Sequence, residues 1–179
     1  PIHFVFTASP SAKPLMTHLR VLIVAEENSR ASIVLEFNGS DESLYFNNPV
    51  TEIELKNDSN LDLTLMERES SRAFHVNNIF VRQGRGSRFH SHTITMGGRL
   101  VRNDLKTVFN DEGAECSLDG LYVVNGSEHV DNHTFIDHAK PHCTSRELYK
   151  GILSGKARAV FNGKIVVRLD AQKTDAMQT

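Results

Sequence analysis

Apolar and polar residues alternate along several short stretches of the chain. In 61–65, Leu61, Leu63 and Leu65 occupy every second position, with polar residues between them. Because successive side chains of a β-strand point to opposite faces, such a stretch has one face for a core and one for solvent. The same alternation marks 32–37, 51–56 and 164–169. No 12-residue window has a clear 3.6-residue period, and the best helical candidate, 144–153, is short, so we expect an all-β chain.

Pairs of turn-forming residues recur along the chain at a nearly constant spacing. One set falls at Asn28-Ser29, Asp58-Ser59, Arg85-Gly86, Glu112-Gly113, Lys140-Pro141 and Asn162-Gly163. A second set lies between them, at Ser70-Ser71, Gly97-Gly98 and Asn125-Gly126. Each unit of about 27 residues therefore holds two strand runs and two corners, and a period of this size is typical of a solenoid.

A unit made only of strands and corners fits the coil of a parallel β-helix, whose coils stack at about 4.8 Å. Equivalent positions lie above one another in such a stack. We therefore expect Leu63, His90, Ser117 and Thr144 in one column, within a residue or two. An antiparallel β-sandwich accounts for strands of this length equally well, and the direction of pairing between the runs around Leu63 and His90 separates the two folds.

Composition and charge narrow the class of protein. Hydrophobic residues make up 39% of the 179 residues, enough for a core, and we expect one domain over 1–179. With 20 Lys and Arg against 22 Asp and Glu, the net charge of −2 gives no basic excess for nucleic acid. No apolar run approaches the roughly 18–20 residues of a membrane helix.

Cysteine usage and the N-terminus bear on the compartment. Two cysteines, Cys116 and Cys143, are too few for a disulfide framework, and the first residues do not have the pattern of a signal peptide. We therefore expect a cytoplasmic protein. Because the first residue is Pro1 rather than Met, we also expect the chain to be a fragment of a longer protein.

Two histidines on one candidate strand suggest a metal site. The stretch 84–92 has the spacing G-x5-H-x-H that opens the metal motif of cupin barrels, and His90 and His92 would share one face of a strand. A carboxylate ligand should follow closely, but Thr93 to Gly97 contain none. We therefore interpret both histidines as polar residues on a solvated face, with a cupin-like metal-dependent enzyme as the alternative.

A second set of metal-ligand residue types is denser. It comprises His129, Asp131, His133, His138, His142 and Cys143. His, Cys and Asp suit zinc or iron. However, Pro141 interrupts the H-x3-H spacing and no C-x2-C pair is present. We expect a hydrogen-bonded polar stripe on the outside of the solenoid.

The two cysteines are separated by one predicted unit. Under the solenoid interpretation, Cys116 and Cys143 occupy equivalent places in neighbouring coils. A thiol pair near His142 could hold iron or a cluster transiently, but a free cysteine is more often a small buried apolar residue.

Motifs for nucleophilic catalysis and nucleotide hydrolysis are missing from the sequence. It contains neither a G-x-S-x-G elbow nor a Walker A loop. We therefore expect a protein that is not an enzyme, and we assign no catalytic, cofactor-binding or metal-ligating residue.

An ordered series of motifs runs through the C-terminal half of the chain. It consists of 120–122, Gly126, His129, 131–134, His138, 141–142, 145–152, 156–167 and 170–179. This series resembles the SufB/SufD family of iron–sulfur cluster assembly proteins. The elements 161–163 and 172–175 resemble the SufD branch more than SufB. The resemblance is strong over 97–179, and 1–85 is compatible with it.

The resemblance implies a right-handed parallel β-helix and a non-catalytic scaffold subunit. Such a subunit acts with SufB and the ATPase SufC in a cytoplasmic complex that assembles iron–sulfur clusters, and it is linked to iron acquisition. It implies no stably bound cofactor, because the intact complex handles iron or a cluster transiently.

Family members carry helical regions before and after the β-helix, and the proposed cluster ligands lie beyond Thr179, so none is transferred to this chain. Within the chain we interpret Asn162-Gly163 as a corner, Gly151 as a close-packed turn, and Arg158 and Lys173 as charge partners or surface groups.

The resemblance also implies that SufD-type subunits pair with themselves. A final coil leaves unpaired backbone groups and uncovered apolar residues such as Ile165, Val167 and Leu169. We therefore expect a homodimer through the C-terminal coils. The run from Ile2 to Thr7 is short, and we expect it to be the less favoured surface.

Overall fold

The computed structural model describes residues 1–179 except 10, 12, 41 and 42, and the described part consists of β-strands, turns and loops. The strands are β1 (Ile2–Ala8), β2 (Leu15–Thr17), β3 (Arg20–Ala25), β4 (Arg30–Gly39), β5 (Tyr45–Asn47), β6 (Val50–Leu55), β7 (Asn60–Arg68), β8 (Phe74–Gln83), β9 (Arg88–Met96), β10 (Leu100–Phe109), β11 (Glu115–Val124), β12 (His129–His138), β13 (Thr144–Leu153), β14 (Arg158–Val167) and β15 (Asp175–Gln178). Among the described residues there is no helix long and apolar enough to cross a membrane.

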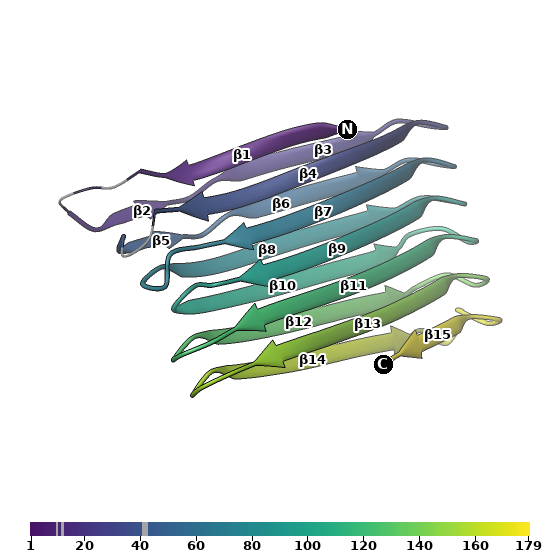
Figure 1. Ribbon diagram of the computed structural model, residues 1–179. Helices are drawn as coiled ribbons and strands as arrows, with labels where there is room; N and C mark the ends of the chain where they lie inside the picture. Colours follow the sequence, from purple (N-terminus) through teal and green to yellow (C-terminus); the bar gives the residue numbers. More distant parts are fainter. Residues whose placement is uncertain (10, 12, 41–42) are drawn as a thin grey trace.

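The strands form two sheets in which each described pairing is parallel. One sheet has the order β1-β4-β7-β9-β11-β13-β15, and the other runs β14-β12-β10-β8-β5-β2, with β6 beside β8 and β3 beside β6. Figure 1 shows the two sheets facing each other, with the two chain ends at opposite ends of the stack. The chain is therefore a β-solenoid of about six turns with about 29 residues per turn. The solenoid prediction is confirmed, and the parallel pairing of β7 with β9 excludes the antiparallel sandwich and the antiparallel cupin barrel.

The coils differ in length, so the expectation of a constant spacing was wrong in detail. Leu63 pairs with Ser91, Ser91 with Leu118, and Leu118 with Glu147, and these three steps along the chain are all of different length. His90 and Ser117 therefore lie one residue from this column, within the predicted residue or two, whereas Thr144 lies three residues from it and was wrongly predicted. Each one-residue shift moves a side chain to the other face of the sheet.

The core lies between the two sheets and is made by alternate residues of each strand. Leu35 pairs with Leu65 and Ile33 with Leu63, so apolar side chains stack from coil to coil. The largest fully buried side chains include Phe37, Phe89, Phe109, Leu55, Leu61, Leu118 and Ile136. The alternating pattern predicted the buried faces of 32–37, 51–56 and 61–65 correctly, but in 164–169 it was wrong for Val167 and Leu169, which are exposed.

One column of corners is built from residues in the left-handed backbone conformation. These residues are Asn28, Asp58, Gly86, Gly113, His142 and Lys173, with φ between 56° and 70°. In the first five, the backbone N–H binds the next coil: Asp58 N–H donates to the carbonyl of Arg85 at 2.8 Å, and Gly86 N–H to that of Glu112 at 3.1 Å. This conformation favours Gly, Asn and Asp, which explains why turn composition located the first five corners correctly. The sixth was wrong, because Asn162-Gly163 lies inside β14 and the chain turns near Lys173 instead.

Two glycines allow tyrosine rings to pack across neighbouring strands. Gly120 pairs with Tyr149, and Tyr122 pairs with Gly151. A Cβ atom on Gly120 would overlap the ring of Tyr149, and one on Gly151 would overlap the ring of Tyr122. Gly151 is therefore a strand residue under an aromatic ring rather than a turn residue, and 144–153 is strand β13 rather than a helix.

Candidate functional site

The structure disperses the second histidine set that the sequence suggested. His133 lies on the outer face of β12, with Nε2 at 2.8 Å from Oδ1 of Asp131. His138 lies inside the solenoid, where Nε2 is 2.9 Å from the hydroxyl of Ser145. Burial lowers the pKa of His138, partly offset by the charge of Asp137.

His142 occupies a corner, with φ of 62°, and Cys143 beside it is fully buried. These residues therefore form neither a metal centre nor one outer stripe, and the expected location was wrong for His138 and Cys143.

The two cysteines do not occupy equivalent positions. Cys116 in β11 pairs with Ser145, whereas Cys143 precedes β13. Both thiols are free and buried, and burial raises the pKa of each. A protonated thiol is a poor nucleophile and a poor metal ligand, so these cysteines behave as core residues.

The first histidine pair, His90 and His92, lies beside an acidic residue that the sequence analysis missed. His90 and His92 share the outer face of β9, as their spacing predicted, and Asp119 of β11 lies opposite His92. Nε2 of His90 is 3.1 Å from Oδ2 of Asp119, and Nδ1 of His92 is 3.6 Å from the same oxygen. The carboxylate comes from the next coil, so a search of the residues directly after His92 could not find it.

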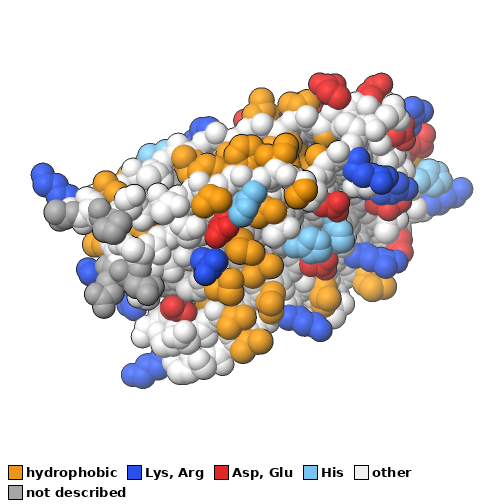
Figure 2. All heavy atoms as spheres, turned by 45° about the horizontal axis from the view of Figure 1, so that its top comes forward, with side chains coloured by type: hydrophobic (Ala, Val, Ile, Leu, Met, Phe, Trp, Pro, Cys, Tyr) orange, Lys and Arg blue, Asp and Glu red, His pale blue; other side chains and the backbone are white. Residues whose placement is uncertain are grey.

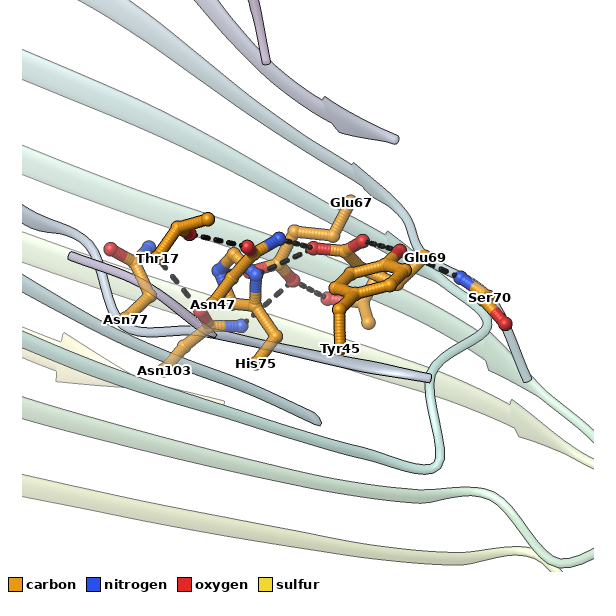
Figure 3. Close-up of polar contacts among 10 residues, drawn as sticks. Thr17, Tyr45, Asn47, Glu67, Glu69, Ser70, His75, Asn77 and Asn103 are labelled. Carbon is orange, nitrogen blue, oxygen red and sulfur yellow. Dashed lines mark hydrogen bonds and ion pairs between the residues drawn. The ribbon is translucent and has the colours of Figure 1, made fainter. Parts of the chain in front are cut away.

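A second polar cluster lies inside the solenoid and was also missed. Its centre is the carboxylate of Glu69, just after β7 (Figure 3). His75 places Nδ1 2.6 Å from Oε1 of Glu69, and the side-chain amide of Asn47 donates to the same oxygen at 3.0 Å. The hydroxyl of Tyr45 donates to the other oxygen, Oε2, and accepts from the backbone N–H of Ser70 at 3.1 Å.

Glu67 extends this network toward the following coils. Its Oε2 accepts from the hydroxyl of Thr95 at 2.6 Å and from the amide of Asn103 at 3.0 Å. Its other oxygen, Oε1, lies 3.4 Å from Nε2 of His75. Asn103 also donates to the amide oxygen of Asn132 at 3.2 Å, so the network spans neighbouring strands of both sheets.

The protonation states follow from burial and from these contacts. Burial raises the pKa of Glu67, and its hydrogen bonds and the nearby His75 do not offset this. Burial also opposes ionisation of Glu69, but the contacts with His75, Tyr45 and Asn47 outweigh it and lower the pKa of Glu69. Burial disfavours the cation of His75, yet Glu69 and Glu67 raise its pKa above the usual value. The shifts of Glu69 and His75 therefore favour their charged forms, and the shift of Glu67 favours its neutral form.

The sequence of the chain matches a known protein family over nearly its whole length. Residues 6–179 match the family model described as the SufBD core domain of SUF-system FeS cluster assembly. The chain belongs to the SufBD core domain family. The match also covers the N-terminal half, where the sequence motifs had been only compatible with the SufB/SufD family.

Several curated relatives of the SufBD chain cover most of its length. It is 31% identical over 186 residues to an iron–sulfur cluster assembly SufBD family protein of Synechocystis, covering 99% of this chain and 41% of the relative. It is 28% identical over 162 residues to the iron–sulfur cluster assembly protein SufD of Escherichia coli, covering 90% and 38%. It is 30% identical over 161 residues to chloroplastic ABCI7 of Arabidopsis thaliana, covering 89% and 34%. The chain thus spans about two fifths or less of these relatives.

The buried network of the SufBD chain predicts unequal effects of two similar substitutions. Glu69→Gln removes the carboxylate that contacts His75, Tyr45 and Asn47 and should lower the free energy of unfolding by about 3 kcal/mol. Glu67→Gln places an amide of the same shape where burial already disfavours the carboxylate, and should cost less than about 1 kcal/mol. Chemical denaturation of the two variants measures both values.

The pH dependence of folding stability is the control for this comparison of the two variants. Because the pKa of His75 is raised, its stabilising contribution is complete below its ordinary value of 6.5 and is lost as the pH rises through the folded value. The stability of the wild-type protein should therefore fall above about pH 6.5, and Glu69→Gln should weaken that dependence. Equal destabilisation by the two substitutions would contradict the opposite pKa shifts of Glu67 and Glu69.

Proposed function

We propose that this chain is the β-solenoid core of a SufD-like, non-catalytic scaffold subunit of the SUF iron–sulfur cluster assembly machinery. The subunit acts in the cytoplasm with a SufB-like subunit and a SufC-like ATPase, and takes part in cluster assembly and iron acquisition. The observation that carries the proposal is the family match over 6–179, which coincides with one continuous solenoid. Relatives named SufD in Escherichia coli and Plasmodium falciparum support the SufD branch.

The architecture supports a scaffold role in physical terms. Each inner strand is held by parallel neighbours on both sides, so the solenoid keeps its shape when a partner binds. Strand edges at both ends of the stack offer backbone groups for pairing with another chain. The buried thiols of Cys116 and Cys143, whose raised pKa keeps them protonated, also favour a non-catalytic role.

Partner binding tests the proposal directly. The full-length protein that contains this core, mixed with the SufB-like and SufC-like proteins of its own organism, should elute as one complex in size-exclusion chromatography with light scattering. Cluster assembly on that complex should require all three subunits. A full-length protein that binds neither partner, while remaining folded by circular dichroism, would contradict the scaffold assignment.

The open strand edges at the two ends of the solenoid are the reason to expect self-association. At the C-terminal end, β15 pairs with only Thr144–Glu147 of β13, and the ten-residue strand β14 has one open edge. At the other end, β1 is a seven-residue strand with one open edge. The C-terminal end nevertheless leaves the longer run of strand unpaired, including half-exposed Val167 and Ile152.

We therefore expect the 179-residue chain to form a two-fold dimer through β14 and its neighbours. Val167→Asp places a charge on that surface. It should raise the dissociation constant of the dimer at least tenfold, as measured in a dilution series. Ile2→Asp, at a position of similar exposure at the other end, is the matched control and should leave the dimer intact. A monomer at all concentrations, or a dimer broken only by Ile2→Asp, would contradict this interface.

A further inference from the structure

The outer face of the seven-stranded sheet carries two histidines and two aspartates from three successive coils. His90 and His92 lie on β9, Asp62 on β7 pairs with His90, and Asp119 on β11 pairs with His92. In Figure 2, histidine side chains gather beside acidic ones on this face of the molecule. We propose that His90, His92 and Asp119 bind one divalent transition-metal ion and that Asp62 orients His90. This inference does not depend on the scaffold function proposed above.

The spacing of the ligand atoms fits a single ion. One nitrogen from each of His90 and His92 and one oxygen of Asp119 all lie within 4.8 Å of one another. The two nitrogens are 3.1 Å and 3.6 Å from the oxygen. Bonds of about 2.0–2.1 Å in a tetrahedral site separate neighbouring ligand atoms by about 3.3 Å. The two nitrogen-to-oxygen separations are therefore close to that of a tetrahedral site.

The two ring nitrogens of His90 have different partners. Nε2 faces Asp119, and Nδ1 lies 3.7 Å from Oδ1 of Asp62 on the opposite side. A metal-bound histidine usually donates its other N–H to a carboxylate or carbonyl, which fixes the tautomer and the direction of the ring. Asp62 is placed for that contact, so three consecutive coils contribute to one site.

The backbone beneath the site is held in place before any ion binds. The strands β7, β9 and β11 lie in the middle of the sheet, and each pairs with a parallel strand on both sides. The side chains of His90, His92 and Asp119 are 41%, 42% and 39% exposed. Water or a small anion can therefore complete the coordination, as in zinc sites with three protein ligands and one open position.

The ligand types select the class of ion. Two imidazoles favour Zn²⁺, Fe²⁺, Co²⁺ or Ni²⁺, whereas Mg²⁺ and Ca²⁺ prefer oxygen ligands. The carboxylates of Asp62 and Asp119 offset the charge of a dication next to neutral imidazoles. The nearby cation Arg88 is paired with Glu115, with Nε at 3.3 Å from Oε2.

Cobalt titration of the tag-free 179-residue protein tests the site. Co²⁺ should bind with one equivalent per chain and give visible absorption bands, and Zn²⁺ should displace it stoichiometrically. Mg²⁺ in large excess should not compete. His92→Ala and Asp119→Asn should each weaken Co²⁺ binding by about 100-fold, and Asp62→Asn by about tenfold, the usual range for residues that orient a ligand.

His133→Ala is the matched control, because His133 is another partly exposed histidine beside an aspartate, on the opposite sheet. It should leave Co²⁺ affinity unchanged. Circular dichroism of each variant separates loss of a ligand from loss of fold. The proposal is overturned if the wild-type protein binds no stoichiometric Co²⁺ or Zn²⁺, or if folded His92→Ala and Asp119→Asn bind as tightly as the His133→Ala control.

Discussion

The parallel backbone ladder between coils is the interaction on which the rest of the structure depends. A strand in the middle of either sheet exchanges hydrogen bonds with the coil before it and the coil after it, so inner strands have no unpaired edge. The left-handed corner residues continue the ladder around one bend, for example from Asp58 to Arg85. Because the ladder fixes which residues stand above one another, it also determines every cluster of side chains in the molecule.

The interior shows two different uses of that stacking. Near β4 and β7, leucines stack in columns and water is excluded by apolar surface. Toward the corner after β7, the ladder instead assembles Glu67, Glu69 and His75, which are buried. Buried charge is tolerated only when it is paired and hydrogen-bonded, and it penalises any shift in register that separates the partners.

Local features of the fold could be predicted from the sequence, whereas contacts between coils could not. The alternation of apolar and polar residues identified the two faces of a strand, because this two-residue period depends only on the strand's own sequence. Residues that tolerate the left-handed conformation identified the first corners, and the same composition misplaced Asn162-Gly163 inside β14, where Gly163 lies against the side chain of Gln178.

Which side chains meet in the candidate sites depends on the number of residues in each coil. The alternation of apolar and polar residues does not reveal that number. Asp119 lies opposite His92 in the ladder, yet it also contacts His90, which lies two positions earlier on β9. Likewise, Cys116 and Cys143 match the predicted unit of about 27 residues but not the actual register, and His138 is buried because it ends an inward-facing column. A period known only approximately locates a strand but cannot say which side chains meet.

The measurement that tests this register most directly is disulfide formation between engineered cysteines, with Cys116 and Cys143 replaced by Ala. Ser117 and Arg146 are register partners on the outer face, so Ser117→Cys with Arg146→Cys should form a disulfide on mild oxidation of the folded protein. Ser117→Cys with Thr144→Cys matches a constant spacing between coils. It joins positions two residues out of register, about 8 Å apart across the ladder, and should remain reduced. Peptide mapping that found the second disulfide and not the first would contradict the account.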